Sequence, residues 1–427
     1  MAGSRKPRQH PDDPFANFAA LRAKGRFRGS RRAAARWTAA ARPPAESTLT
    51  SRRRFLGKGA ATVAGLALVP PWLAAACGGD DDDDTAAAGD TTQSSNDTLR
   101  ISNWPLYIAE GFVDQFAEAS GLSVDYKEDF NDNEQWFAKV RDPLERGQDI
   151  GADLVVPTDF MAGRLIRLEW LNPLNDENIP NKSNLRPDLL EASIDPERVY
   201  TLPYMSGMVG LGYNRRLAGR DITSVDDLWD PTFQGRVSLL ADTQDALGMV
   251  MLGQGDDPAD PSTEAVQRAA DRVAEEKDKG QIRRFTGNDY IDDLAAGNLV
   301  IAQAYSGDVV QLQADDPDLD FVVPEAGGTT FVDVMIIPVT TRNQLGAEEW
   351  MNYVYDRANY AQLVNEVQYV PVLSDMTDEL AKLDPEVANN PLINPQEETF
   401  ALLHSWPALT DEQDAEYATI YAEVTGE

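Results

Sequence analysis

Aromatic and acidic residues recur just after the short apolar runs of this sequence that are typical of strands. In open α/β sheets, ligands bind at the carboxyl ends of the strands. The residues at such positions are Trp104, Tyr107, Thr158, Phe160, Asp242, Asp245, Tyr305, Asp308, Phe331 and Asp333. Carboxylates give ammonium groups charge-assisted hydrogen bonds, and aromatic faces attract cations by about 0.5–2 kcal/mol per contact. Collected in one place, these residues would suit a ligand with alkylammonium groups.

Most of these residues also have a purely structural interpretation. Asp242 could cap a helix, as could Asp159, and Trp104 or Phe331 could fill the core. Asp333 is harder to explain in this way because a carboxylate in an apolar strand is costly unless it is paired. No Lys or Arg lies near it in the sequence. We therefore expect Asp333 to meet a cation.

The elements that must position these side chains alternate between strand and helix. Strands are expected over residues 99–101, 153–156, 207–213, 236–240, 299–304, 321–323 and 331–337. Helices are expected over residues 110–120, 159–168 and 262–276, where apolar residues share a helical face. This alternation predicts an α/β architecture with largely parallel sheets. The roughly 330 residues after the first 98 exceed the usual size of one core, so we expect two domains with a ligand cleft between them.

The composition excludes several other classes of function. The chain has 427 residues, with 38 Lys and Arg against 71 Asp and Glu, two His and one Cys. A single cysteine rules out an internal disulfide and a cysteine-cluster metal site. His10 and His404 alone are a poor basis for zinc chemistry or for Ser–His or Cys–His catalysis, and no cofactor is indicated. The formal net charge of −33 argues against nucleic acid as a partner and fits the attraction of cations.

Residues 1–76 are interpreted as a long leader that ends in an export signal. Residues 1–58 carry 15 Lys and Arg against 3 Asp and Glu, and the stretch from 59 to 76 is uncharged. A basic segment, a short apolar run and small residues before a cleavage site are typical of export signals. The run Arg53-Arg54-Phe55-Leu56 resembles the twin-arginine motif. A membrane-spanning helix is the alternative, but the apolar run before Pro70 is shorter than the roughly 20 residues that a bilayer requires.

Cys77 follows Leu73-Ala74-Ala75-Ala76 and resembles the lipid-modified cysteine of a bacterial lipobox. A plain signal-peptidase site at the three alanines is the alternative. Residues 77–98 are rich in Gly, Asp, Thr and Ser, so we expect a flexible acidic linker there. Together these features predict an extracytoplasmic protein, in the periplasm or on the outer face of the cell membrane, that is lipid-anchored at Cys77.

Several separated motifs carry a resemblance to a known family. The motifs are Asn103-Trp104-x-x-Tyr107-Ile108, Asp153-Leu-Val-Val-Pro-Thr158, Asp227-Leu-Trp-Asp-Pro-x-Phe-x-Gly235, Asp242-x-x-Asp245, Tyr290-Ile-x-Asp-Leu-x-x-Gly297, Tyr305-Ser-Gly-Asp308 and Gly327-Gly-x-x-Phe-Val-Asp333. In order and spacing, the chain from about residue 99 to 425 resembles the spermidine/putrescine-binding proteins of bacterial ABC importers. The resemblance implies a two-lobed periplasmic-binding-protein fold (type II), α/β with mostly parallel sheets. It also implies a monomeric binding protein and not an enzyme.

The resemblance implies a role for each matching position. Trp104 and Tyr107 would form an aromatic wall in the first lobe. Asp242 and Asp245 would hold one terminal amine, and Asp333 would be the central carboxylate. The other implied ligand contacts are Thr158, Phe160, Tyr305 in place of the usual Trp, Asp308 as in the putrescine-preferring branch, Phe331 and Tyr369.

The resemblance also implies two chain crossovers, near Met205–Gly207 and Val332–Val334. Lobe 1 would comprise residues 99–205 and 334–375, and lobe 2 residues 206–333 and 376–427. The ligand would be a polyamine captured by lobe closure. The closed form would dock on an ABC permease that a cytoplasmic ATPase serves.

Two departures from the family pattern leave the choice among polyamines open. Pro105-Leu106 replaces a polar or acidic pair that receives the far amine, and Pro407 stands where a Gln can contribute. One alternative is a protein of the same fold for another ligand, such as ferric iron, an oxyanion, a sugar or another small solute, although the acidic residues argue against an oxyanion. An exported enzyme is a further alternative. Asp242 and Asp245, three residues apart, favour joint action on one ligand group over a glycosidase mechanism.

Overall fold

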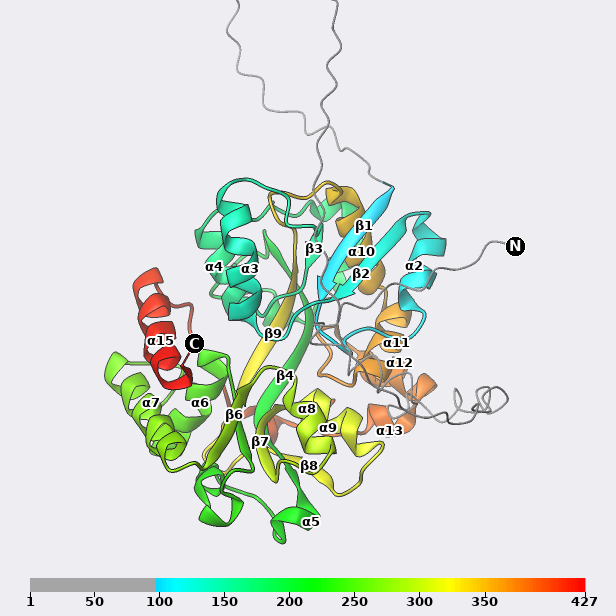
Figure 1. Ribbon diagram of the computed structural model, residues 1–427. Coiled ribbons are helices and arrows are strands. Elements are labelled where there is room, and N and C mark those ends of the chain that lie inside the picture. Colours follow the sequence, from blue (N-terminus) through cyan, green and yellow to red (C-terminus); the bar gives the residue numbers. More distant parts are fainter. Residues whose placement is uncertain (1–96, 427) are drawn as a thin grey trace, which may run out of the picture. The chain divides into compact units, whose positions relative to one another are not determined.

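The computed structural model describes residues 97–426, which form an α/β unit (Figure 1). The predicted leader, the twin-arginine motif, Cys77 and nearly all of the acidic linker lie outside the described residues, and they stay predictions. Within the described part of the chain, none of the helices combines the length and the apolar character that crossing a membrane requires.

A ten-stranded mixed sheet runs through the described residues (Figure 1). The order of the main path is β2-β1-β3-β9-β4-β7-β5-β6, while β10 pairs with β9 and β8 pairs with β4. The strands are β1 (Thr98–Asn103), β2 (Ser123–Glu128), β3 (Leu154–Val155), β4 (Thr201–Asn214), β5 (Val237–Leu240), β6 (Ile282–Thr286), β7 (Ile301–Tyr305), β8 (Leu319–Val322), β9 (Gly328–Ile336) and β10 (Leu403–His404). The outer pairs are parallel, whereas β4 is antiparallel to β7, β8 and β9. The predicted α/β class is confirmed, and the antiparallel pairing is confined to the strands around β4 and β9.

The strands β4 and β9 lie side by side in the middle of the sheet and join its two ends (Figure 1). All of β4 is buried, as expected for a strand that is covered on both faces. Met205 of β4 pairs with Asp333 of β9, so the two predicted crossovers meet at one level of the sheet. Gly207 leaves room for the Phe331 ring, because a Cβ at that position would lie 2.4 Å from the ring atom Cζ. The central strands thereby place an aromatic ring and a carboxylate next to each other.

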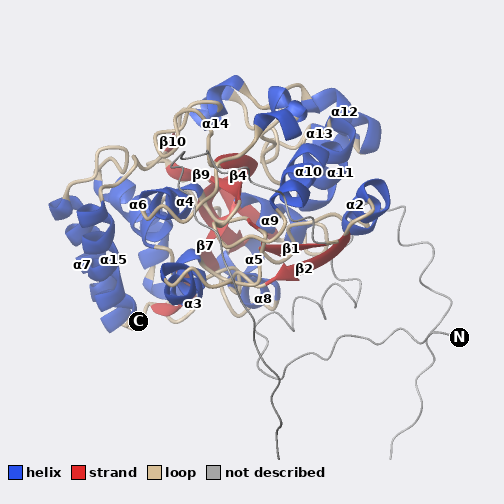
Figure 2. Cartoon of the chain, turned by 90° about the horizontal axis from the view of Figure 1, so that it is seen from above, coloured by secondary structure: helices blue, strands red, loops and turns tan. Residues whose placement is uncertain are grey.

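Helices surround these central strands when the molecule is seen from above (Figure 2). The helices are α2 (Phe112–Ser120), α3 (Asn133–Glu145), α4 (Asp159–Arg167), α5 (Arg215–Ala218), α6 (Thr243–Gln254), α7 (Thr263–Asp278), α8 (Tyr290–Ala295), α9 (Ser306–Gln313), α10 (Gln344–Val354), α11 (Arg357–Val367), α12 (Met376–Leu383), α13 (Pro385–Ala388), α14 (Glu397–Phe400) and α15 (Asp411–Thr425). The three predicted helices are present as α2, α4 and α7. Helix α7 begins where the Ser262 side chain accepts a hydrogen bond from the Ala265 amide, which satisfies one of the free N–H groups of its first turn.

Three strands of the sheet were not predicted from the sequence: the two-residue β10, β2 and β6. In β2, Asp125 and Lys127 interrupt the apolar residues, and exposed positions alternate with half-buried ones. In β6, Arg283 and Arg284 stand in the middle of the strand. Strands β2 and β6 lie at the ends of the sheet order, where one edge is unpaired and charged side chains are tolerated.

Two groups of elements flank the central pair. The first half comprises β1–β3 with α2–α4 and α10–α13, and the second half comprises β5–β8 with α5–α9 and α15. Helix α15 packs against α7 and α6, whereas α12 packs against α11 and α13. Residues 376–388 thus pack with elements of the first half, although they were predicted in lobe 2, and the whole lobe division stays a prediction.

Candidate functional site

Two adjoining pockets lie against the central strands. The first has an empty volume of about 330 Å³ and is lined by Trp104, Pro105, Tyr107, Thr158, Asn288, Tyr305, Asp308, Phe331, Asp333 and Tyr369. The second has an empty volume of about 670 Å³. Thr158 and Phe331 form part of the wall of both pockets. A ligand in one pocket would therefore be separated from the other pocket only by these shared wall residues.

Asp333 lies on β9 at the first pocket and is only 5% exposed. The Tyr107 hydroxyl donates a hydrogen bond to its Oδ2 at 2.7 Å, and the Thr158 hydroxyl donates to its Oδ1 at 2.8 Å. Burial raises the pKa of Asp333 to about 7, although the two hydroxyl donors act in the opposite direction. The main charged groups that act on this pKa are Asp159 and Asp245, which also raise it, and none of the main contributors is a Lys or Arg. Within the described chain, Asp333 therefore has neutral partners and no counter-ion.

Asp308, in the first turn of α9, is a second buried carboxylate of this pocket. The Tyr290 hydroxyl and Asn288 Nδ2 donate hydrogen bonds to its Oδ2 at 2.7 and 3.0 Å, and the Tyr369 hydroxyl donates to its Oδ1 at 2.7 Å. Burial raises the pKa of Asp308 to about 6, against the lowering effect of these three donors. The donors come from two separate segments, 288–290 and the one that contains Tyr369, and they fix the orientation of the carboxylate.

Helix α6 begins at the predicted acidic pair. Asp242 stands at the N-cap position, but its side chain makes no capping hydrogen bond. Instead, Asn133 Nδ2 donates to its Oδ2 at 3.1 Å, and its Oδ1 has no hydrogen-bond partner within the described chain. Asp245 accepts a hydrogen bond from the Tyr305 hydroxyl at 2.9 Å and lines the second pocket. Burial raises the pKa of Asp242 well above its ordinary value, as does the nearby Asp245 carboxylate, and burial raises that of Asp245 to about 7.

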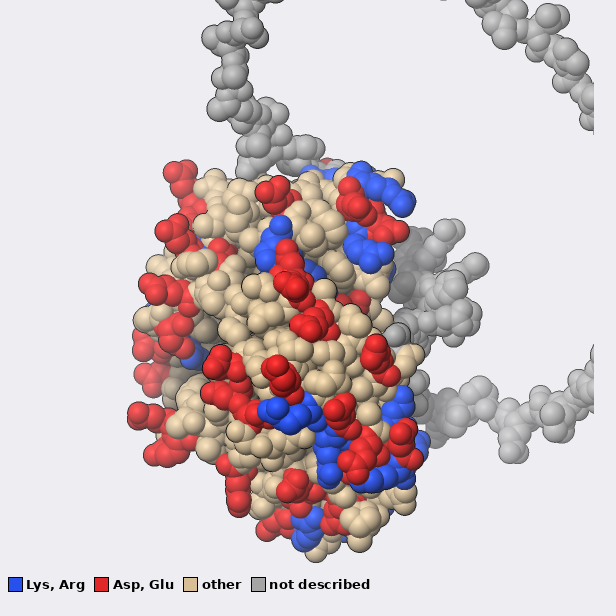
Figure 3. All heavy atoms as spheres, turned by 90° about the vertical axis from the view of Figure 1, so that its left-hand side faces the viewer, with Lys and Arg blue, Asp and Glu red and all other residues tan. Residues whose placement is uncertain are grey.

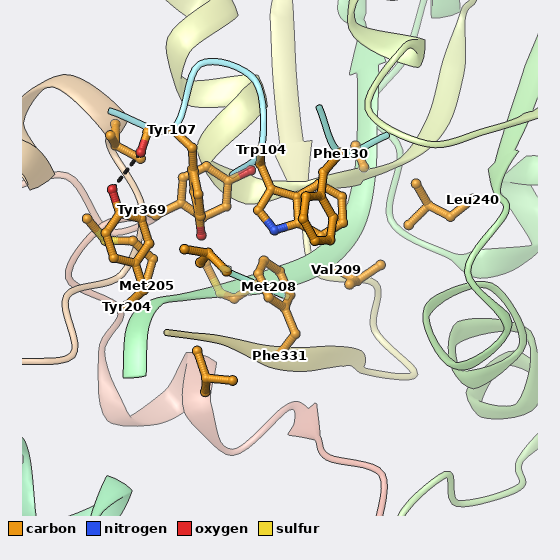
Figure 4. Close-up of a cluster of buried hydrophobic side chains, with 14 of the residues drawn as sticks. Trp104, Tyr107, Phe130, Tyr204, Met205, Met208, Val209, Leu240, Phe331 and Tyr369 are labelled. Atoms are coloured by element: carbon orange, nitrogen blue, oxygen red, sulfur yellow. Dashed lines mark hydrogen bonds between the residues drawn. The ribbon is translucent and has the colours of Figure 1, made fainter. Parts of the chain in front are cut away.

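Aromatic rings line the first pocket. Figure 4 shows Trp104, Tyr107, Phe331 and Tyr369 in one cluster of buried side chains. Tyr107 and Tyr369 meet edge to face with ring centroids 5.0 Å apart, and Phe331 meets Tyr305 in the same manner at 5.2 Å. Trp104 lies against Phe130 at 4.7 Å, which holds the indole at the pocket wall. These rings give the pocket apolar surface between its two carboxylates. The same faces attract cations.

The structure brings most of the predicted ligand residues together. Around the first pocket lie Trp104, Tyr107, Thr158, Tyr305, Asp308, Phe331, Asp333 and Tyr369. Phe160 and Asp245 line the second pocket, and Asp242 lines neither, although Asn133 hydrogen-bonds both Asp242 and Thr158. The two departures from the family pattern are also wall residues, Pro105 of the first pocket and Pro407 of the second. The ligand roles of all these residues stay predictions.

Three polar residues of the site were missed from the sequence: Asn133, Asn288 and Tyr290. Tyr290 belongs to one of the motifs that carry the family resemblance, so a signal for it was present. Asn288 follows β6, the strand that was not predicted. Asn133 is the first residue of α3, where a polar residue has no distinguishing pattern. Its contact with Asp242 joins the first half of the molecule to the second.

A group of ion pairs joins α4 of the first half to α15 of the second. Arg164 donates to both oxygens of Asp414 at 2.8 Å and to Glu134 at 2.9 Å. Arg167 donates to Asp414 at 2.9 Å and also pairs with Asp411. On the face of the molecule in Figure 3, acidic side chains are scattered widely among uncharged ones, and basic side chains appear in fewer places. Arg164 and Arg167 thus neutralise acids where the two halves meet.

Comparisons with known proteins place this architecture in a family. Residues 111–395 match the bacterial extracellular solute-binding proteins. This chain belongs to that family. The solute-binding protein is 26% identical over 312 residues to the spermidine/putrescine-binding periplasmic protein 1 of Haemophilus influenzae, which covers 73% of this chain and 84% of the relative. It is 29% identical over 309 residues to the spermidine/putrescine-binding periplasmic protein of Escherichia coli, with 71% and 85% covered.

A solved structure agrees with the predicted fold. The spermidine/putrescine ABC transporter substrate-binding protein of Streptococcus pneumoniae superposes on the solute-binding protein with a TM-score of 0.63 and 23% identity. The match covers 77% of this chain and 98% of that one. The predicted periplasmic-binding-protein fold of type II is thereby confirmed.

Proposed function

We propose that this solute-binding protein binds a polyamine of the putrescine/spermidine type outside the cytoplasm and delivers it to an ABC importer. The observation that carries the proposal is the presence of two buried carboxylates, Asp308 and Asp333, in one pocket without a basic partner. A diammonium ligand supplies one positive group to each carboxylate. Its methylene chain packs on rings such as Trp104 and Phe331. The ligands named for the relatives support the same choice.

Ligand capture proceeds by lobe closure in this proposal. The first pocket takes Tyr107 from the first half and Asp308 and Tyr305 from the second. A ligand that contacts both halves favours the arrangement in which both are within reach, which shifts the population toward the closed form. The closed monomer then docks on a permease that an ATPase serves. The protein acts as a carrier and not as an enzyme, and Cys77 holds it at the membrane by a lipid anchor.

The main alternative is another ligand on the same fold. Among residues 97–426, no group of three or more His, Cys, Asp and Glu side chains is arranged to hold a metal ion. The described chain therefore supplies no such cluster for ferric iron. An oxyanion would be repelled by Asp308 and Asp333 once they are ionised.

Calorimetric titration of the purified protein tests the proposal. The ligands are putrescine, spermidine, spermine, ferric citrate and sulfate, each at two salt concentrations. Saturable binding of one polyamine, weaker at high salt, is the expected result because salt screens the attraction between acidic protein and cation. Binding of sulfate or ferric citrate without any polyamine would overturn the proposed ligand class and leave the fold untouched.

Gly307 is a position where a small change should disturb the pocket without altering its charge. A Cβ on Gly307 would lie 2.0 Å from Cδ2 of Tyr369. The ring must therefore move, which breaks its contact with Tyr107 and its hydrogen bond to Asp308. We expect Gly307→Ala to weaken putrescine binding by about tenfold or more, in line with the loss of one hydrogen bond to a charged group.

The measurement for Gly307→Ala is calorimetric titration together with thermal unfolding. Alanine in a helix is otherwise favoured over glycine by roughly 0.5–1 kcal/mol. A variant that is more stable than the wild type and binds putrescine equally well would show that the Tyr369 ring is not needed where it lies.

Arg164 should support the closed form, because its ion pairs with Asp414 join the two halves. Both side chains are largely buried, at 14% and 12% exposure. We expect Arg164→Met to lower polyamine affinity by about tenfold, since the closed form loses hydrogen bonds to a charged group. Arg141→Met is the control, because Arg141 is 60% exposed and pairs only with its neighbour Asp142 within the described chain.

Small-angle scattering provides the second readout for Arg164→Met. The variant should need more ligand than the wild type to reach the compact state. Equal affinities and equal scattering for the Arg164 and Arg141 variants would contradict a role of the α4–α15 ion pairs in closure.

A further inference from the structure

Asn288 lies between β6 and α8 and contributes to the wall of the first pocket. It is 5% exposed. Its Nδ2 donates a hydrogen bond to Asp308 Oδ2 at 3.0 Å, while its Oδ1 is buried and has no hydrogen-bond partner within the described chain. A buried acceptor without a partner costs free energy. A ligand that donates a hydrogen bond to this oxygen would remove that cost.

The orientation of the Asn288 amide follows from its neighbour. An ionised carboxylate can only accept hydrogen bonds, whereas an amide has a donor end and an acceptor end. If the Asn288 amide were flipped, its oxygen would face the Asp308 carboxylate, and two acceptors would repel each other. Asp308 therefore holds the Nδ2 end, and the acceptor oxygen remains for another donor.

The Asp308 carboxylate has few acceptor positions left for hydrogen bonds from a ligand's ammonium group. A carboxylate offers about four lone-pair positions, and Tyr290, Asn288 and Tyr369 already donate to three of them. A primary ammonium group carries three N–H donors, so a single remaining position on Asp308 cannot satisfy it. Asn288 Oδ1 is a neutral acceptor directly beside this carboxylate and is itself unpaired.

We propose that Asn288 is a specificity-determining residue, whose Oδ1 accepts a second N–H from the ammonium group bound at Asp308 and thereby selects primary amines over N-alkylated ones. The inference rests on the proposed polyamine function and deepens it. Asp308 recognises the charge of the ligand, and Asn288 recognises how many N–H donors that charge carries. A tertiary ammonium offers one N–H, which leaves Asn288 Oδ1 buried and unpaired.

The test compares putrescine with N,N,N′,N′-tetramethylputrescine, which keeps both charges but has one N–H at each end. Calorimetric titration gives the ratio of the two dissociation constants for the wild type, Asn288→Leu and Tyr290→Phe. Leucine removes the acceptor without making room for the methyl groups. Tyr290→Phe is the matched control, because it also removes a donor to Asp308 but keeps the Asn288 oxygen.

The wild type should prefer putrescine, and Asn288→Leu should reduce that preference about tenfold or more. Tyr290→Phe should weaken the binding of both ligands by the same factor and leave the ratio of their dissociation constants unchanged. If both variants leave the ratio unchanged, Asn288 only positions Asp308 and the inference is overturned. Should Asn288→Leu fail to fold, Asn288→Val gives the same comparison. A wild type that binds neither diamine would instead overturn the proposed function.

Discussion

Replacement of Asp333 by asparagine should weaken polyamine binding by about 30- to 4,000-fold. The carboxylate is buried, and in the proposed complex its partner is an ammonium group. Removing one member of a buried charge pair costs roughly 2–5 kcal/mol, and about 1.4 kcal/mol corresponds to a factor of ten. Asparagine keeps the shape and can still accept from Tyr107 or Thr158, so the fold should remain intact.

Calorimetric titration with putrescine and spermidine measures the effect of Asp333→Asn, and thermal unfolding confirms the fold. Asp125→Asn is the control, because Asp125 lies on β2, is 50% exposed and pairs only with Lys127 within the described chain. Equal affinities for the two variants would mean that the ligand binds away from Asp333. The proposal for the first pocket would then be wrong.

Polyamine affinity should rise steeply between about pH 5 and pH 8. Burial raises the pKa of Asp333 and of Asp245 to about 7 and that of Asp308 to about 6. Below these values the carboxyl groups are protonated and give an ammonium group no charge to bind. Each such group should lower the affinity by about tenfold for each pH unit below its pKa. The amines remain charged throughout, since alkylamines titrate near about 10.

The stability of the ligand-free protein should change in the opposite direction. Asp245, Asp308 and Asp333 have raised pKa values in the folded state, so between about pH 4 and pH 7 the folded protein binds more protons than the unfolded chain. Their contribution to the free energy of unfolding is complete below about pH 4 and is lost as the pH rises through the folded pKa values. The increase in thermal stability on adding putrescine should therefore be largest near about pH 8.

Titrations in two buffers with different ionisation enthalpies check this pH dependence directly. Binding near neutral pH should release protons from the pocket carboxyls, so the observed enthalpy should differ between the buffers. Constant affinity from about pH 5 to pH 8 without proton release would contradict the assignment of these carboxyls to the ligand.

Several residues that line the first pocket could be found in the sequence because they lie in or directly after a recognisable apolar run. Asp333 and Asp308 come at or just after buried strands, and a buried strand has a strong pattern of its own. The strands β2 and β6 lack that pattern because they lie at the ends of the sheet and carry charged residues. Asn288, which follows β6, was missed for the same reason.

Contacts that depend on side-chain direction could not be predicted. Phe160 is the second residue of α4, and only the placement of that helix decides that its ring lines the second pocket and not the first. Likewise, Asp242 stands where a capping residue is expected, yet its carboxylate accepts a hydrogen bond from Asn133, which is 109 residues away in the sequence. Sequence spacing carries no information about a contact of this range.

The position at which Met205 of β4 pairs with Asp333 of β9 has a mechanical consequence. In the proposed mechanism, the carboxylate that holds an ammonium group lies there, at the hinge between the two halves. The α4–α15 ion pairs lie to one side of this strand pair (Figure 1). When two bodies rotate about a fulcrum, displacement grows with distance from it. On this proposal, a small rotation set by a ligand only a few atoms long would become a larger shift of the helices at the side, where a permease could detect it.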